Sequence, residues 1–368
     1  MATPTNDLVL AALKNVQDPD LHQDLVTLGM IRDLSISSSG DVSFRVVLTT
    51  PACPMKAKIE QDCRNAVSKV AGIGKIEIKM DSEVRGKSAQ ATGAIPGVTH
   101  IIAVSSGKGG VGKSTVAVNL ALSLSLEGAR VGLMDADVYG PNVPTMMGVT
   151  EEPKIVQDPV KGERFLPPSS HGIKVMSMGF LIPGDQPVVW RGPMLHSVVS
   201  QFCHQVEWGT LDYLVVDMPP GTGDVQLSLA QLVPVTGAVL VTTPQEVSMQ
   251  DVRKAFSMFE KVRVPVMGVV ENMSYFICDG CSKKHTLFGS DGGKALAKKL
   301  KTELLAELPI QPQVREGGDE GRPIVIRNPE SEVALSFRAL ARKVAQQVSI
   351  ATSQGVDPSQ LVQIGKFN

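Results

Sequence analysis

One stretch of nine residues constrains the fold of this chain more than any other: residues 107–115 read GKGGVGKST. The stretch matches the pattern G-x-x-x-x-G-K-[ST], in which glycines let backbone amides approach phosphate oxygens. A short apolar, β-branched run precedes it (99–104, THIIAV), and a helical pattern follows it and ends near Gly128. A strand, a glycine-rich turn and a helix in this order predict a phosphate-binding loop.

Each position of this loop has an expected role. Lys113 is expected to act as a catalytic cation on the β- and γ-phosphates, and the Ser114 hydroxyl to bind Mg²⁺. Free amides and the dipole at the start of the helix add to the attraction for phosphate. The expected nucleotide contacts are Gly107, Gly109, Gly110, Val111, Gly112, Lys113, Ser114 and Thr115.

Two acidic residues at the ends of predicted strands complete the expected site. The strand 130–137 (RVGLMDAD) runs to Asp137, and a second apolar strand starting at residue 211 ends at Asp217. Ligands bind beyond the carboxyl ends of strands in open parallel sheets, so both carboxylates should face the phosphate loop. Asp217 suits holding Mg²⁺ through water, and Asp137 suits positioning or activating the attacking water. The segment 221–224 (GTGD) that follows is expected to sense the γ-phosphate.

The sequence favours adenine over guanine as the base of the bound nucleotide. The chain has no [NT]-K-x-D motif, whose Asp reads the N1 and N2 groups of guanine, so ATP is expected. Asn272, at the end of the predicted strand 265–270, is a candidate for contacting the adenine through its side-chain amide.

Lys108 stands at the second position of the loop, where an ordinary phosphate loop needs no lysine. It resembles the signature lysine of the deviant Walker A loop (K-G-G-x-x-G-K-[ST]) in the ParA/MinD superfamily, which reaches across a dimer interface to the partner's nucleotide. The resemblance implies a homodimer in which Lys108 is catalytic, because it neutralises transition-state charge much as an arginine finger does.

Cys278 and Cys281 form a second chemical feature, a C-D-G-C pair in a predicted loop. Two thiols at this spacing can lie on one side of a tight turn, which suits a metal or a cluster. His285 would extend the pair to a Cys2His zinc set, but no second nearby pair closes a tetrahedron. Two chains on a two-fold axis would supply four thiolates. These could hold an iron-sulfur cluster or Zn²⁺, and the residues do not choose between them.

The motifs together resemble the Mrp/ApbC type of iron-sulfur carrier ATPase, over roughly residues 95–348. The segments that carry the resemblance are 108–115 (KGGVGKST), 135–144 (DADVYGPNVP), 217–224 (DMPPGTGD), 271–274 (ENMS) and the C-x-x-C pair. The resemblance implies a homodimer, ATP binding and slow hydrolysis. It also implies a labile cluster, usually 4Fe-4S, bridged between two C-x-x-C pairs and passed to apo-proteins.

The chain is expected to contain two domains. A helix (about 5–16), a hairpin (31–37 and 41–49), a helix (about 54–71) and a strand (73–84) predict a small α+β domain over 1–84. Residues 85–98 have the composition of a linker, 99–350 form the expected ATPase domain, and 351–368 the C-terminal tail. In the ATPase domain, strands alternate with helices. This order predicts an α/β P-loop NTPase whose mainly parallel sheet is covered by helices on both faces.

Two helices of the ATPase domain carry more specific expectations. The helix from about 248 to 262 is expected to begin with a capping box of Ser248 and Asp251. The amphipathic helix 332–348 has no basic face with bulky aromatic residues, so it should pack on the ATPase core rather than on a membrane.

The small domain resembles the SufT/PaaD-like domain that recurs in iron-sulfur assembly factors. The resemblance rests on residues 18–20 (DPD), 25–31 and 49–54 (TTPACP). Cys53 lies just ahead of a predicted helix, whose amides and dipole can stabilise a thiolate. Both a cluster contact and an unreactive, partly buried cysteine remain open for it, whereas Cys63 and Cys203 are expected to be packing residues.

The composition of the chain limits the classes of partner that it is expected to bind. The 36 basic and 37 acidic residues give a formal net charge of −1, so nothing favours nucleic acid as a partner. Five cysteines are a sparse, odd set that fits a reducing cytoplasm, and no apolar stretch approaches the ~20 residues that span a bilayer. Two alternatives to a cluster carrier stay open: a ParA/MinD-like positioning ATPase, and a zinc-bridged dimeric ATPase with an unrelated client.

Overall fold

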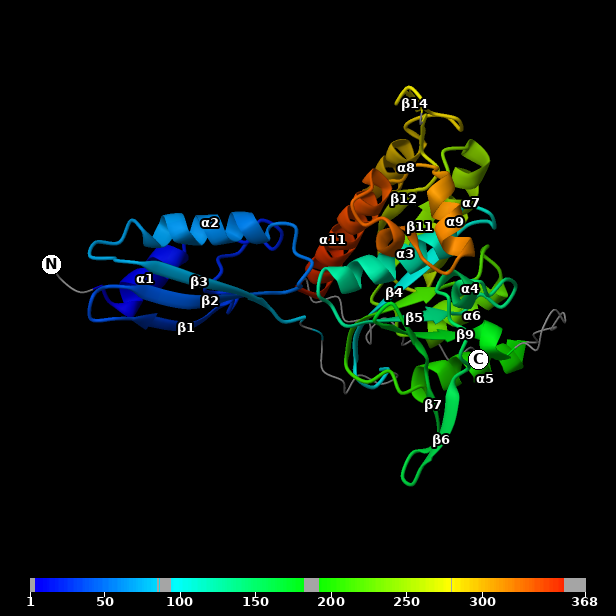
Figure 1. The fold of residues 1–368 in the computed structure, drawn as a ribbon, viewed down its shortest axis with the longest axis horizontal. Helices are drawn as coiled ribbons and strands as arrows, with labels where there is room; N and C mark the ends of the chain where they lie inside the picture. The colour runs from blue at the N-terminus through cyan, green and yellow to red at the C-terminus, as the bar shows by residue number, and fades with distance from the viewer. Residues whose placement is uncertain (1–3, 85, 87–93, 182–191, 279, 354–368) are drawn as a thin grey trace. The chain divides into compact units, whose positions relative to one another are not determined.

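The structure is a computed structural model that describes residues 4–84, 86, 94–181, 192–278 and 280–353 (Figure 1). It contains two compact units, one of Met1–Arg85 with Ala345–Gly355 and one that takes in Gly86–Val344. Most of the expected linker and of the expected C-terminal tail lies outside the described residues. The domain boundaries given above therefore stay a prediction.

The N-terminal unit has the predicted α+β character. Its sheet has the order β1-β2-β3, with β2 antiparallel to β1 and parallel to β3. The elements are α1 (Asn6–Leu13), β1 (Ile31–Ile36), β2 (Val42–Leu48), α2 (Lys56–Val67) and β3 (Ile76–Ser82). Leu13, Phe44, Ile59 and Cys63 are buried in its own hydrophobic core. The predicted order of helix, hairpin, helix and strand is confirmed.

The larger unit is built on an eight-stranded sheet of order β15-β12-β11-β4-β10-β5-β9-β8. All neighbouring strands are parallel except β8, which pairs antiparallel with β9 at one edge. The strands are β4 (Val98–Ser106), β5 (Val131–Asp135), β8 (Ser169–Ser170), β9 (Ile173–Ser177), β10 (Leu211–Asp217), β11 (Gly237–Thr242), β12 (Val266–Glu271) and β15 (Glu303–Glu307). The predicted mainly parallel α/β fold is confirmed.

Helices cover both faces of this sheet. As a result, every residue of β5, β10 and β11 is buried. The helices are α3 (Lys113–Leu126), α4 (Val143–Met146), α5 (Gly192–His204), α6 (Asp224–Leu232), α7 (Glu246–Lys261), α8 (Gly292–Leu300), α9 (Pro312–Asp319), α10 (Ile324–Arg327) and α11 (Glu332–Ser353), with a 3₁₀ turn at Met178–Leu181. Figure 1 shows α3 running beside β4, the strand from which it continues.

The predicted packing of the last helix on the ATPase core is confirmed. Phe337, Leu340 and Val344 of α11 are buried, and Arg338 and Arg342 both donate to Glu127 at the end of α3, each at 2.9 Å. The helix runs on to Ser353, five residues past the expected end. Among the described helices, none has the length and apolar character to cross a membrane.

The structure adds elements that the sequence pattern did not predict. Two hairpins are new, β6–β7 (Lys154–Asp158 and Gly162–Leu166) and β13–β14 (Phe276–Ile277 and Lys284–His285), together with α4, α6, α9 and α10.

The predicted capping box of α7 is wrong. The helix begins at Glu246 with Gln245 as its N-cap, so Ser248 lies inside the first turn. The buried Ser248 hydroxyl instead accepts from the backbone N–H of Thr243 at 3.3 Å and bonds the hydroxyl of Thr242 at 3.0 Å. The connection from β11 is short, so the helix starts two residues earlier than the serine signal indicates.

Candidate functional site

The predicted phosphate loop lies between the end of β4 at Ser106 and the start of α3 at Lys113. Gly110 and Gly112 have φ angles of 81° and 82°, in the left-handed region that other residues rarely adopt. Gly107 is needed for a different reason, because a Cβ there would lie 2.2 Å from the backbone carbon of Asp251 in α7. The loop is therefore shaped by its own glycines and by a neighbouring helix.

A cavity of about 420 Å³ opens over this loop. Lys108, Lys113, Ser114 and Asp137 all line it, so four of the residues expected to act on a nucleotide face one space. Cavities of this size commonly hold small ligands and cofactors.

Lys113 is the centre of a buried charge cluster. Its Nζ donates to Oδ1 of Asp217 at 2.6 Å and lies 3.3 Å from both Oδ2 of Asp137 and the Ser114 hydroxyl. Burial disfavours the charged lysine, but the carboxylates of Asp217 and Asp137 outweigh it and raise the pKa of Lys113 above its usual range. Burial raises the pKa of Asp217, against the pull of Lys113. The other oxygen of Asp217, Oδ2, is buried without a hydrogen-bond partner among the described residues.

Asp135 is a buried member of this cluster for which no separate role was predicted. It accepts from the N–H of Asp137 at 3.1 Å, the N–H of Val143 at 3.2 Å and the Ser177 hydroxyl at 2.8 Å. Burial, and then the charge of Asp217, raise its pKa to about 8. The D-A-D spacing was the available signal, because it sets both carboxylates at the same strand end.

The carboxylate of Asp137 is itself oriented by the backbone. Its Oδ1 accepts from the N–H groups of Tyr139 at 3.0 Å and Gly140 at 3.2 Å. The other oxygen of Asp137, Oδ2, lies 3.3 Å from Nζ of Lys113. Asp135 thus positions the backbone of Asp137 by accepting its N–H, and the N–H groups of the following turn orient the carboxylate of Asp137.

Asn272 lies against the phosphate loop. Its side-chain Nδ2 donates to the carbonyl of Val111 at 2.9 Å, and its backbone N–H donates to the carbonyl of Thr242 at 2.8 Å. A Cβ on Gly112 would come within 2.2 Å of that Nδ2. The structure therefore uses the amide donor of Asn272 to brace the loop, and the contact with adenine stays a prediction.

The residues beside Asn272 lead toward the cysteine pair. Glu271 is 1% exposed and accepts from the Ser274 hydroxyl at 2.5 Å and from the N–H of Gly293 at the start of α8. Ser274 donates its N–H to the carbonyl of Leu308 at 2.9 Å. The segment from 271 to 274, called the junction segment below, is therefore held on one side to the phosphate loop and on the other to α8 and the end of β15.

The cysteine pair lies in the β13–β14 hairpin, which begins two residues after the junction segment. Cys278 donates its N–H to the carbonyl of Lys283 at 3.0 Å and accepts from the N–H of Ser282 at 2.8 Å. Cys278 is half-buried and Cys281 is exposed, while Asp279 lies outside the described residues. No group of three or more His, Cys, Asp and Glu side chains suited to a metal occurs in the described part of the chain. His285 therefore does not join the two thiols in a ready zinc set.

Of the two roles left open for Cys53, the structure favours the partly buried, unreactive thiol. Burial, supported by the charges of Asp20 and Asp18, raises the pKa of Cys53 to about 11, although the N–H groups of Met55 and Lys56 act in the opposite direction. The neutral thiol is favoured because burial and two nearby carboxylates outweigh the amides ahead of α2.

Cys63 and Cys203 are buried packing residues, as expected. Burial raises the pKa of each thiol to about 12, with the charge of Asp62 contributing at Cys63.

Comparison with known proteins extends these observations. Residues 97–345 match the family described as NUBPL iron-transfer P-loop NTPase, and residues 6–80 match the one described as iron-sulfur cluster assembly protein. A Synechocystis protein named iron-sulfur cluster carrier protein is 53% identical over 349 residues, which are 94% of this chain and 99% of the relative. A Deinococcus radiodurans protein of the same name is 50% identical over 357 residues, or 97% and 99% of the two chains.

A solved structure matches the larger unit. It is a nucleotide-binding protein from Archaeoglobus fulgidus in complex with ADP, with a TM-score of 0.57 and 37% sequence identity. The match covers 67% of this chain and 96% of the archaeal one.

Proposed function

This chain belongs to the family of NUBPL iron-transfer P-loop NTPases, and on that premise we propose that it is an ATP-dependent carrier of iron-sulfur clusters. The observation that carries the proposal is that a buried Lys113–Asp217 pair and the Cys278/Cys281 pair belong to one unit and are linked by the junction segment. A positioning ATPase is not favoured, since these relatives are named as cluster carriers.

In the proposed nucleotide site, Lys113 contacts the phosphates of ATP. When ATP enters the cavity, its β- and γ-phosphates compete with Asp217 and Asp137 for the ammonium group, which lies within 3.3 Å of both carboxylates. Asp217 and the Ser114 hydroxyl would hold Mg²⁺, a role that fits the buried Oδ2 of Asp217, which has no hydrogen-bond partner among the described residues. Mg²⁺ at this site would neutralise charge on the phosphate oxygens.

Hydrolysis needs a water aligned on the γ-phosphate. Asp137 is the residue we assign to that water, because the N–H groups of Tyr139 and Gly140 hold its Oδ1 and leave Oδ2 toward the cavity. Lys108 lines the same cavity and is assigned to the partner's nucleotide in a homodimer.

The cluster half depends on two chains. Each chain offers the thiols of Cys278 and Cys281, and two chains related by a two-fold axis would offer four, the number that a 4Fe-4S cluster takes. The exposure of Cys281 suits a cargo that must be received and passed on to apo-proteins. Thiols that must stay reduced to bind a cluster fit a reducing compartment such as the cytoplasm.

The two halves are coupled, in this proposal, through the junction segment. A change in the phosphate loop at Val111 would move Asn272, and Glu271 and Ser274 tie that movement to the first residues of the hairpin. ATP binding and hydrolysis would thus alter the spacing of the cysteine pairs in a dimer.

The test is a measurement of iron, zinc and acid-labile sulfide per chain after anaerobic reconstitution. We expect about two irons and two sulfides per chain, as for one four-iron cluster shared by two chains, and their loss in Cys278→Ser/Cys281→Ser. The matched control is Cys53→Ser, which should keep both. Zinc without sulfide, or iron that remains when the pair is removed, would reject the carrier function and leave a dimeric ATPase.

A further inference from the structure

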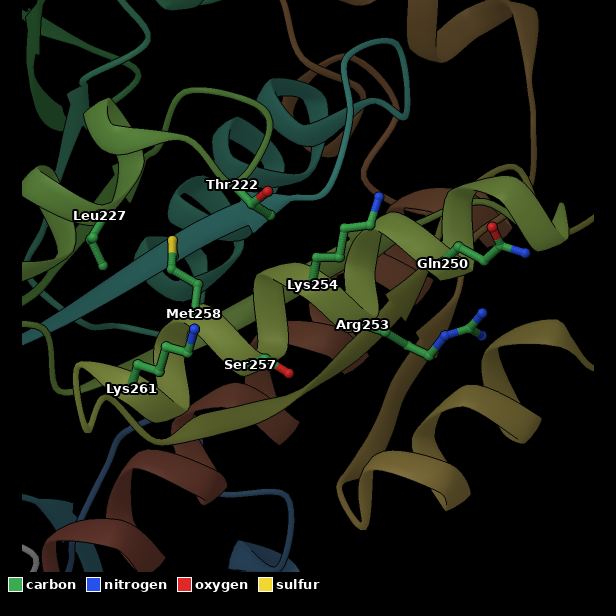
Figure 2. Close-up of a pocket in the computed structure, with 8 residues that line it drawn as sticks. All are labelled: Thr222, Leu227, Gln250, Arg253, Lys254, Ser257, Met258 and Lys261. Atoms are coloured by element: carbon green, nitrogen blue, oxygen red, sulfur yellow. The ribbon is translucent and has the colours of Figure 1, made fainter.

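A second cavity, of about 760 Å³, lies along one face of α7 (Figure 2) and shares no lining residue with the cavity over the phosphate loop. Its walls are α7, the first turns of α6 and the loop that contains Thr222. Figure 2 shows the side chains of Lys254, Met258 and Lys261 rising from α7 toward the side where Thr222 and Leu227 lie. We call this cavity the α7 groove.

All the charged residues that line the α7 groove are basic: Arg253, Lys254 and Lys261. Lys254 is 68% exposed and pairs with Asp251 at 3.0 Å, and Arg253 pairs with Glu246 at 2.9 Å. Exposed pairs of this kind contribute little and exchange readily for another carboxylate. Lys261 makes no ion pair within the described residues. The groove thus offers three cations to an incoming anionic group.

The floor of the groove is apolar. Met258 is 7% exposed and Leu227 is half-buried, and both line the groove. Thr222, Gln250 and Ser257 add polar groups at the rim. Carboxylates spaced along an extended segment, with an apolar side chain between them, would match this arrangement of cations and floor.

The same features argue against a nucleic acid. The 16 residues of α7 span about 24 Å, and besides the three cations they carry three acids, Glu246, Asp251 and Glu260. A phosphate backbone would meet those carboxylates as soon as it passed the groove. A short acidic segment that stays within the groove would not meet them.

Both walls of the α7 groove touch the phosphate loop. On one side, the backbone of Asp251 and Val252 lies so close to Gly107 that a Cβ there would not fit. On the other, Gly221, next to Thr222, donates its N–H to the carbonyl of Ser106 at 3.0 Å. A shift of the loop on nucleotide exchange would therefore be passed to each wall.

We propose that the α7 groove is the docking site for an acidic segment of the recipient protein, and that the bound nucleotide controls its affinity. The inference rests on the proposed carrier function for the identity of the partner. The chemistry of docking needs only the cations, the apolar floor and the contacts with the phosphate loop.

The test uses a fluorescein-labelled peptide of about six residues, which spans about 20 Å when extended and in which glutamates alternate with single leucines. Its binding to the full chain is measured by anisotropy. We expect saturable binding whose dissociation constant differs about tenfold or more between ADP and a non-hydrolysable ATP analogue. Lys254→Glu/Lys261→Glu should weaken binding about tenfold or more, because two attractive contacts become repulsive. Lys298→Glu/Lys301→Glu, on exposed lysines of and after α8, is the matched control and should bind normally.

Three results would overturn the proposal: equal binding of a peptide with lysines in place of the glutamates, affinity unchanged by the α7 charge reversal, or affinity indifferent to the nucleotide. The anisotropy assay contains no iron-sulfur cluster. A negative docking result would therefore not bear on the iron and sulfide measurement, which tests the carrier function. Conversely, a chain that takes up no cluster but binds the acidic peptide would reject the carrier function alone.

Discussion

The phosphate loop and the cysteine hairpin belong to one unit but differ in how far a single chain completes them. Lys113, Asp137 and Asp217 are each less than 10% exposed, and Lys113 pairs with both carboxylates. Cys278 and Cys281 lie in a hairpin of two-residue strands, with one thiol half-buried and the other exposed.

This difference follows from the chemistry expected at each place. A buried lysine and buried carboxylates are stable only when paired, so the nucleotide site must be assembled within the chain. Thiols that hand over a cargo must remain accessible to another protein. One region therefore has its buried charges paired before its ligand arrives, with only the proposed Lys108 contact to be added by a second chain. The other offers two of the four thiols proposed to hold a cluster.

The largest effect is expected when the cation of the buried site is removed. Lys113→Ala should lower ATP hydrolysis by about a thousandfold or more, because nothing else at that position stabilises charge on the γ-phosphate. Iron and sulfide per chain should stay close to the wild type. The measurements are phosphate release and cluster content on the same preparation.

Asp137→Ala is the companion variant for that experiment. It keeps Lys113 and its pair with Asp217 but removes the residue assigned to the attacking water. Wild-type hydrolysis in both variants would show that the buried cluster is not the catalytic site.

A smaller effect is expected at the junction segment. Ser274→Ala removes the 2.5 Å hydrogen bond to Glu271 but touches neither the cavity nor the thiols. Hydrolysis and cluster content should each change less than about twofold, whereas the stimulation of cluster release by ATP should fall several-fold.

The matched control for that variant is Ser336→Ala, which removes a hydroxyl that bonds within α11. If ATP stimulated release equally in Ser274→Ala and the wild type, the junction segment would not be the coupling route.

The smallest expected effect concerns the dependence of stability on pH. The pKa of Asp135 is raised to about 8, so the native state holds a proton that the unfolded chain releases above about pH 4. This contribution is fully present below about pH 4 and is lost as the pH rises to about 8. Asp135→Asn should therefore flatten the decline between pH 6 and 8, by at most ~1.4 kcal/mol per pH unit. Urea unfolding of both proteins at pH 6, 7 and 8 measures the difference; parallel declines would contradict it.

Much of the nucleotide site was predictable because its signals are local. The spacing of glycines from 107 to 112 and the apolar run before it identify the loop, and strand ends predict where Asp137 and Asp217 lie. The parallel sheet then brings these distant positions together, since β4, β5 and β10 are neighbours.

What the sequence could not predict depends on neighbours that are far apart along the chain. The pKa of Cys53 is set by burial and by Asp18 and Asp20 more than by the helix that follows. The amide of Asn272 is occupied by Val111, a contact across 161 positions. The two-residue strands of β13–β14 are too short to show any periodicity.

Gly107 shows how such a contact limits what mutation can do. The absence of a side chain there is required by the backbone of α7 at Asp251 and Val252, whatever nucleotide is bound. A substitution at Gly107 would therefore act as a folding defect before it acted as a binding defect. For the same reason, the loop cannot be transplanted into another scaffold by its nine residues alone, because the helix that leaves room for Gly107 has to be transferred with it.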